Sequence, residues 1–220
     1  MHIGASDGRH TVVMSRLIGD GEIHCFEPSS YTLKILRRVL NIHRIRNVKT
    51  HNVAMGDQAG NTYLITPVKR NGHIGRSFAF LSDKIPDIDS LKQTRGFRNI
   101  IVDTVPVCTV DSFCKKQQIE TIQFIRCDVE GAEMLVLKGA GEVIKKNRPL
   151  MLLEVHPFSL RDHFSSSAED LYRILASWRY RMFFVDGNSL VEANHFFKEP
   201  WRDYFCVPEE KVQQIMTNKS

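Results

Sequence analysis

The sequence predicts an α/β fold, with a mostly parallel sheet covered by helices on both faces. Short apolar segments that suit buried strands alternate along the chain with longer segments of helical periodicity. A glycine-rich turn at residues 4–8 follows the first of these strands. Near the C-terminus the alternation gives way to strands with no long helix between them. The alternation is typical of a parallel sheet, and the ending indicates an antiparallel hairpin.

In the N-terminal half, short runs rich in β-branched and aromatic residues predict strands at 22–26, 48–53, 62–66 and 100–107. Asp7 is expected to cap a helix that ends near residue 18, and Ser29 or Ser30 a helix that ends near residue 43. Residues 67–98 hold five Pro or Gly residues and no clear period. We expect an irregular, functional segment there.

In the C-terminal half, apolar runs predict strands at 123–127, 149–153, 181–185, 190–191 and 204–207. Thr109 or Asp111 begins a short helix. Residues 132–146 form a longer helix with an apolar face, and residues 168–178 form the next one. We expect a loop at residues 157–167.

The chain has 220 residues, which suits a single domain, expected at residues 1–208 with a C-terminal tail at 209–220. Only residues 1–3 precede the glycine-rich turn, so we expect a truncated first strand. No apolar run is long enough to cross a bilayer. Five cysteines without a C-x-x-C spacing predict neither a zinc site nor a disulfide framework, which favours a cytoplasmic protein. The net charge of +5 favours a solvated surface over a nucleic-acid partner.

Small or polar residues follow the predicted parallel strands, at the points where these strands end. In an open α/β sheet, ligands bind at the carboxyl ends of the strands. The residues at these ends are His2 to Gly8, Glu27, Asn52, Ala54, Asp128, Glu130, Glu154 and His156. The sequence therefore predicts a binding crevice. Small residues in the turn let a ligand approach the main chain, and Glu27 could accept both hydroxyl hydrogens of an adenosine ribose.

Four motifs occur in an order that resembles the FkbM family of S-adenosylmethionine-dependent methyltransferases. They are Gly4-Ala5-x-x-Gly8, Phe26-Glu27-Pro28, the segment 52–57, and Asp128-Val129-Glu130-Gly131-Ala132-Glu133. The last is the most specific, and the segment 153–156 resembles the Glu-x-His strand end of the family. The resemblance implies a Rossmann-like class I methyltransferase fold, with a seven-stranded sheet and a reversed last strand. It also implies S-adenosyl-L-methionine as cofactor and O-methylation of a hydroxyl on a sugar, a glycan or a natural product.

The expected cofactor contacts follow the order of these motifs: His2, Gly4, Ala5, Ser6 and Gly8 for the methionine part, Glu27 and Pro28 for the ribose, Ala54 and Met55 for the adenine, and Asp128 for the amine. The family generally has an acidic residue in place of His2. For Met55, core packing is an equal alternative.

Asp128, Glu130 and His156 are the expected catalytic residues, because they stand where the acceptor and the methyl group should meet. Asp128 could orient the amine, act as a base, hold a divalent ion or cap the helix that follows. Glu130 and His156 are the other candidate bases. We assign no metal site, because the remaining histidines show no ligand spacing. The acceptor, a small molecule or a glycan, is expected under residues 67–98 and 157–167, where Arg70, His73 and Arg76 could contact it.

Three other functions remain open. A catalytically inactive binding domain with the methyltransferase fold would explain His2 and the short first strand. An NAD-dependent oxidoreductase would share the fold, but the turn is G-A-x-x-G rather than G-x-G-x-x-G. A nucleic-acid methyltransferase is disfavoured, because the chain has neither an Asn-Pro-Pro-Tyr motif nor an interleaved basic and aromatic patch.

Overall fold

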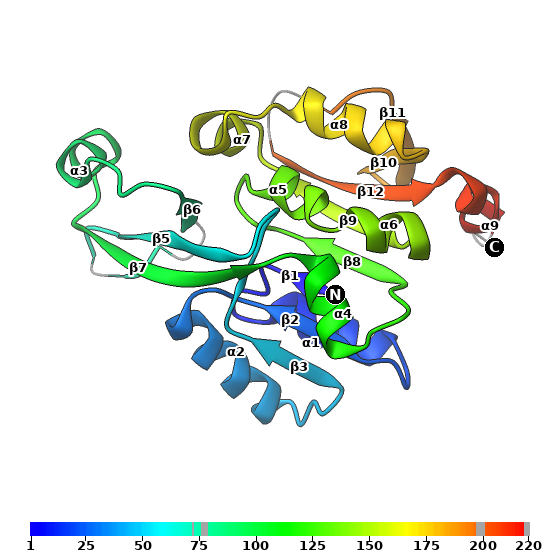
Figure 1. Ribbon diagram of the computed structural model, residues 1–220, viewed down its shortest axis with the longest axis horizontal. Coiled ribbons are helices and arrows are strands. Elements are labelled where there is room, and N and C mark those ends of the chain that lie inside the picture. The colour runs from blue at the N-terminus through cyan, green and yellow to red at the C-terminus, as the bar shows by residue number, and fades with distance from the viewer. Residues whose placement is uncertain (72, 76–78, 197–200, 218–220) are drawn as a thin grey trace. The chain divides into compact units, whose positions relative to one another are not determined.

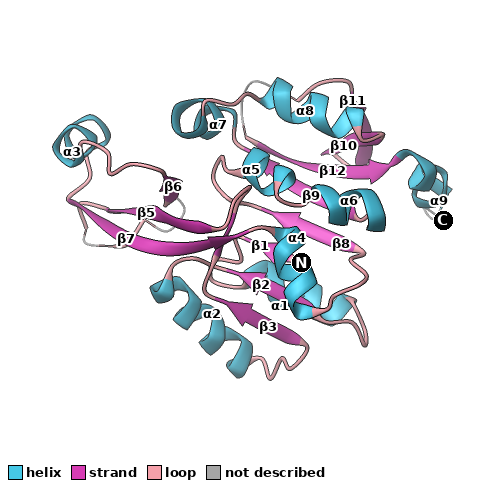
Figure 2. Ribbon diagram, in the orientation of Figure 1, coloured by secondary structure: helices cyan, strands magenta, loops and turns pink. Residues whose placement is uncertain are grey.

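The computed structural model describes residues 1–71, 73–75, 79–196 and 201–217 (Figure 1). The chain divides into two compact units, Met1–Thr109 and Val110–Ser220. Each unit combines strands and helices (Figure 2). Among the described residues, every helix is too short or too polar to span a bilayer.

The first unit begins with three parallel strands in the order β1-β2-β3. These strands and the helices between them are β1 (His2–Ile3), α1 (Arg9–Leu17), β2 (Ile23–Phe26), α2 (Ser30–Ile42) and β3 (Val48–His51). Leucines of α2 pack with Ile23 and Cys25 of β2 in one buried cluster. Ser29 caps α2 by accepting a hydrogen bond from the Thr32 amide, as predicted. The predicted Asp7 cap is wrong, because the N-cap of α1 is Gly8, which has no side chain.

A separate four-stranded sheet in the first unit, with the order β4-β7-β5-β6, was not predicted. Its strands are β4 (Ala54–Met55), β5 (Gly60–Val68), β6 (Phe80–Ser82) and β7 (Asn99–Cys108), and α3 (Ile88–Arg95) precedes β7. β5 and β7 form a long antiparallel pair, from Gly60 opposite Val107 to Val68 opposite Asn99. The prediction that residues 67–98 are irregular is therefore wrong where β6 and α3 form regular structure. The strand predicted at 48–53 ends at His51. The next strand, β4, pairs with β7 in the four-stranded sheet.

The second unit holds strands in the order β11-β10-β12-β9-β8. Its elements are α4 (Val110–Gln117), β8 (Phe124–Cys127), α5 (Glu133–Lys138), α6 (Gly141–Asn147), β9 (Leu150–Val155), α7 (Pro157–Phe164), α8 (Ala168–Ser177), β10 (Tyr180–Asp186), β11 (Ser189–Ala193), β12 (Arg202–Pro208), η2 (Glu209–Lys211) and α9 (Val212–Thr217). β8 and β9 are parallel, whereas β12 is antiparallel to both β9 and β10. The predicted antiparallel hairpin at the C-terminus is confirmed by β10 and β11.

Two predictions for the second unit are wrong. The single helix expected at 132–146 is two helices, and Asp111 accepts hydrogen bonds from the amides of Glu142 and Val143 at the start of the second one. These bonds satisfy orphan amides and stabilise a new helix start. The loop expected at 157–167 contains α7, where Pro157 occupies a position that suits the first turn of a helix.

Candidate functional site

The glycine-rich turn of the first unit is pinned to the end of β2. The amides of Gly4 and Ala5 donate to the Phe26 carbonyl over 3.0 and 3.1 Å. Gly4, Ser6 and Gly8 all have positive φ angles. A Cβ on Gly8 would lie 2.5 Å from Cδ1 of Leu36, so this glycine also lets α2 pack closely. The absence of a side chain at Gly8 therefore serves packing as well as access to the main chain.

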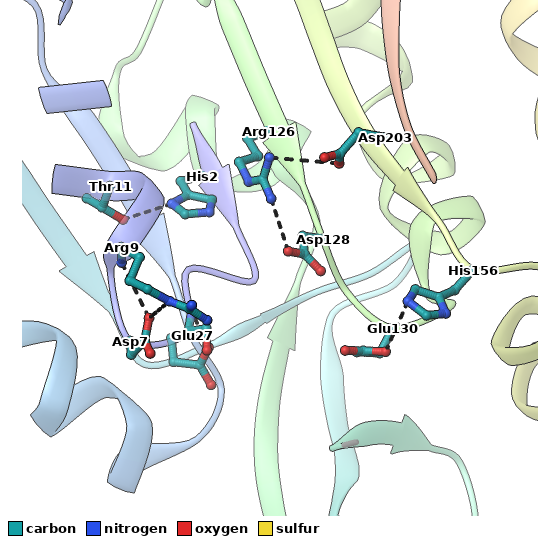
Figure 3. A network of polar contacts seen from close by, with 11 residues as sticks. His2, Asp7, Arg9, Thr11, Glu27, Arg126, Asp128, Glu130, His156 and Asp203 are labelled. Carbon is teal, nitrogen blue, oxygen red and sulfur yellow. Dashed lines mark hydrogen bonds and ion pairs between the residues drawn. The ribbon is translucent and has the colours of Figure 1, made fainter. Parts of the chain in front are cut away.

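Glu27 follows β2 and holds the turn through its side chain (Figure 3). Its Oε2 accepts from the Ser6 amide at 3.0 Å and its Oε1 from the Ser29 amide at 2.9 Å. The Asn52 side chain donates to the main-chain carbonyls of Glu27 and Pro28, over 2.9 and 2.8 Å. A carboxylate has about four acceptor positions, so a residue bound in this way can also accept ribose hydroxyls. The chemistry of Glu27 fits the ribose of S-adenosylmethionine.

Three other predicted cofactor residues of the first unit, His2, Ala54 and Met55, are buried. In β1, the imidazole Nδ1 of His2 lies 2.8 Å from the Thr11 hydroxyl (Figure 3). Ala54 and Met55 are only 3 % and 2 % exposed. Ala54 packs in the core of the four-stranded sheet, and Sδ of Met55 lies 3.6 Å from Sγ of Cys108. These contacts favour the packing alternative for Met55 over contact with adenine.

Four carboxyl groups of the second unit form a group that we call the carboxyl cluster: Asp128, Glu130, Glu154 and Asp203. Strand geometry assembles it. Glu154 on β9 lies directly opposite Asp203 on β12, and Asp128 follows β8 on the same face as Arg126 because strand side chains alternate. Glu154 also shares a hydrogen bond with Asp128.

Arg126 supplies positive charge to this cluster. Its side chain is 5 % exposed, its Nη2 lies 3.3 Å from Oδ2 of Asp128, and its Nη1 lies 3.9 Å from Oδ1 of Asp203 (Figure 3). Neither Arg126 nor Asp203 was among the predicted site residues. An arginine inside an apolar strand was a signal for Arg126, because a buried charge needs a partner. The position of Asp203 depends on strand register, which the sequence does not reveal.

The carboxyl cluster favours protonated carboxyl groups. Burial and then the charges of Asp128 and Glu133 raise the pKa of Glu130 to about 8. Burial, the hydrogen bond to Asp128 and the neighbouring carboxylates raise the pKa of Glu154 well above its usual range. Glu130 and Glu154 therefore carry protons at neutral pH for most of the time.

The segment from Asp128 to Glu133 has a backbone that few sequences allow. Glu130 and Gly131 have φ angles of 52° and 106°. A Cβ on Gly131 would lie 2.6 Å from the main-chain carbon of Ser159 in α7. Glu133 is fully buried, and its Oε1 accepts from the Gly131 amide at 3.1 Å. Burial raises the pKa of Glu133 to about 7, although main-chain hydrogen bonds oppose the shift. This turn sets the position of Glu130.

His156 lies at the end of β9, as the N-cap of α7. Its Nε2 is 3.9 Å from Oε2 of Glu130 (Figure 3). Burial lowers the pKa of His156, and the charge of Asp128 opposes this shift. A neutral imidazole at neutral pH is able to accept a proton. The structure thus brings two of the predicted catalytic residues, Glu130 and His156, close together.

The structure describes two of the three residues expected to contact the acceptor. Arg70 and His73 are exposed, and Arg76 lies outside the described residues. Within the part of the chain that the structure describes, no group of three His, Cys, Asp or Glu side chains is arranged to hold a metal ion.

Comparisons with known proteins identify the family and the fold of this chain. The family described as Methyltransferase FkbM domain matches residues 2–182. "Methyltransferase 1" of Beauveria bassiana (strain ARSEF 2860) is 26 % identical over 144 residues, which are 63 % of this chain and 57 % of that protein. The crystal structure of Methyltransferase FkbM from Methylobacillus flagellatus KT matches with a TM-score of 0.56 and 18 % identity, over 93 % of this chain and 42 % of that one. This match confirms the predicted Rossmann-like fold. The chain spans little more than half the length of the first relative and less than half of the second.

Proposed function

Because this chain belongs to the FkbM methyltransferase domain family, we propose that it transfers a methyl group from S-adenosylmethionine to a hydroxyl oxygen of a sugar, a glycan or a natural product. The observation that carries the choice of a hydroxyl acceptor is the neutral His156 beside Glu130. An alcohol loses its proton as it is methylated, so the reaction needs a proton acceptor at the site.

When bound, S-adenosylmethionine supplies an electrophilic methyl group on a sulfonium, which keeps the bonding pair once the methyl group leaves. The turn at residues 4–8 binds the methionine part through its main chain, next to His2. Glu27 accepts from the ribose hydroxyls beside Pro28, and its two amide contacts hold the carboxylate in a fixed orientation. Asp128 binds the amine. Ala54 and Met55 are buried in the core, so they shape the adenine side of the site through packing and do not contact the base.

His156 would take the proton of the acceptor hydroxyl as the oxygen receives the methyl group that S-adenosylmethionine supplies. Fixing this geometry supplies much of the rate in a displacement of this kind. Glu130 is the second candidate base, but only in the smaller fraction of molecules in which its carboxyl group has lost the proton; there the raised pKa makes it a stronger base than an ordinary carboxylate. Asp128 orients the acceptor through the hydrogen-bonding positions that Arg126 and Glu154 leave on its carboxylate.

The test is transfer of a labelled methyl group from S-adenosylmethionine to a panel of methyl glycosides, oligosaccharides and hydroxylated natural products. We expect at least one hydroxyl compound to be methylated. Binding of S-adenosylmethionine without turnover on the whole panel would favour the inactive binding domain. Titration calorimetry with both cofactors decides the other alternative, since binding of NAD without binding of S-adenosylmethionine would indicate an oxidoreductase. The single domain expected at residues 1–208 stays a prediction, which limited proteolysis can test.

A further inference from the structure

The indole of Trp201 stacks on the imidazole of His156. The ring centroids are 5.5 Å apart and the ring planes are inclined by 14°. Arg202, the first residue of β12, pairs with Val155 of β9, so the next step of the same antiparallel register sets Trp201 opposite His156. Side chains directly opposite one another in such a pair are close enough to touch. Main-chain pairing therefore places this contact.

The main chain of His156 begins α7, but this does not fix the orientation of its imidazole ring. The ring is therefore oriented by contacts with other side chains. The residue is the N-cap of α7, with φ −108° and ψ 90°, and its side chain makes no capping hydrogen bond. Pro157 follows and restricts the His156 backbone to extended conformations, but it does not restrict the side chain. Among the residues that the structure describes, two contacts define the ring: the stack on Trp201, and Glu130, whose Oε2 is 3.9 Å from Nε2.

We infer that Trp201 is a positioning residue that holds the His156 imidazole flat against the indole, with Nε2 toward Glu130. The inference rests on the proposed function, in which His156 accepts the proton of the hydroxyl. The stack removes water from one face of the imidazole, and burial is the main cause of the lowered pKa of His156. The stack on Trp201 therefore both orients the His156 ring and helps to keep it neutral.

Core packing does not account for Trp201, which is 55 % exposed. A residue with a purely structural role would change the stability of the second unit when it is replaced, and would leave the titration of His156 as it was. Replacing a positioning residue would change the titration of His156 and leave the stability of the second unit nearly unchanged. The two roles are distinguished by measurements on the imidazole itself.

The first experiment uses the wild-type ring contact. The chain has two tryptophans, so Trp178→Phe leaves Trp201 as the only indole. In this protein, labelled at histidine and tryptophan, NMR should show nuclear Overhauser contacts between the rings of Trp201 and His156 and an upfield ring-current shift of the His156 protons. Absence of both would overturn the inference, and no further variant has to fold for this result.

The second experiment follows the titration of His156 by NMR in three variants. Trp201→Ala should raise the pKa of His156 toward its ordinary value of about 6.5. Trp201→Phe should keep it near the wild-type value, because a flat ring is retained. Phe158→Ala is the matched control, since Phe158 is an exposed aromatic two residues from His156 and is contacted by Arg161. An unchanged pKa of His156 in folded Trp201→Ala would overturn the inference.

Turnover gives a third measurement where an acceptor is found. Trp201→Ala should lower kcat by about tenfold, move the acidic limb of the pH profile upward and leave the affinity for S-adenosylmethionine unchanged. Trp201→Phe should restore both kcat and the pH profile. The NMR measurements need no turnover, so failure of the proposed function leaves them able to decide the role of Trp201.

Discussion

Nδ1 of His24 lies 3.1 Å from Nε2 of His51, and the two imidazole rings are stacked with planes inclined by 6°. On its other side, Nε2 of His24 lies 2.8 Å from a Glu22 oxygen. The pair joins β2 to β3 just before Glu27 and Asn52. A hydrogen bond between two imidazoles requires that at least one of them be neutral, so this junction depends on pH.

Acidification should destabilise the protein through this pair. Burial lowers the pKa of His24, opposed by Glu22, and burial followed by the charges of His24 and Lys49 lowers the pKa of His51. Arg37 acts on His51 in the same direction as Lys49. The unfolded chain therefore takes up protons at pH values where the folded pair stays neutral. Stability is full above about pH 6.5 and falls as the pH drops, by up to about 1.4 kcal/mol per pH unit for each proton.

The measurement is the melting temperature between about pH 7.5 and pH 5.5. His51→Phe should reduce the loss of stability in acid, because it removes one of the two titrating rings and keeps an aromatic side chain beside Phe26. His43→Phe, at an exposed histidine, is the control. Equal pH dependence in wild type and His51→Phe would rule the pair out as the cause.

The sequence predicts the parallel strands, most helices and the antiparallel ending, because these depend on local periodicity and capping. It does not predict the pairing of β5 with β7 or the helix break before α6, because both depend on distant partners. Val107 opposite Gly60 is a non-local contact, and Asp111 caps α6 from another helix. The same limit explains why Glu27 was recognised at a strand end, whereas Asp203 and Trp201 required the register of β12 on β9.

Glu27→Ala should weaken binding of S-adenosylmethionine by about 1–3 kcal/mol, because the ribose hydroxyls lose a charged acceptor and the Ser6 amide loses its partner. Titration calorimetry measures the change. Glu22→Ala is a matched control, since it removes a partly exposed carboxylate that precedes the same strand. If the Glu27→Ala variant binds S-adenosylmethionine with unchanged affinity, Glu27 does not bind the ribose.

His156→Ala should lower turnover by about 10²–10⁴-fold and leave the affinity for S-adenosylmethionine nearly unchanged, because the proposed base acts on the acceptor alone. Single-turnover rates and calorimetry measure the two effects separately. The comparison is Glu130→Gln. If Glu130→Gln abolishes turnover while His156→Ala retains it, the base is Glu130.

Asp128→Asn should reduce both turnover and cofactor affinity, because we assign Asp128 to the cofactor amine and to the acceptor. Asparagine keeps the shape and loses the charge that Arg126 contacts. Asp203→Asn is the control, because Asp203 also contacts Arg126 but has no assigned role in binding. If Asp128→Asn lowers turnover and leaves cofactor affinity unchanged, Asp128 does not bind the cofactor amine. Turnover that survives treatment with a chelator would exclude the alternative in which Asp128 holds a divalent ion.

Gly131→Ala should destabilise the second unit by about 2–4 kcal/mol, because alanine would meet both a left-handed backbone and a clash with α7. The φ angle is 106°, and the added Cβ would lie 2.6 Å from the main-chain carbon of Ser159, which cannot move aside as a flexible side chain can. Gly187→Ala separates the two effects. Gly187 has a φ angle of 56° and no atom within 4 Å of an added Cβ, so only the backbone cost of about 1 kcal/mol remains. Urea unfolding of both variants gives the comparison, and equal losses would show that the close approach of α7 to the Asp128–Glu133 turn adds nothing.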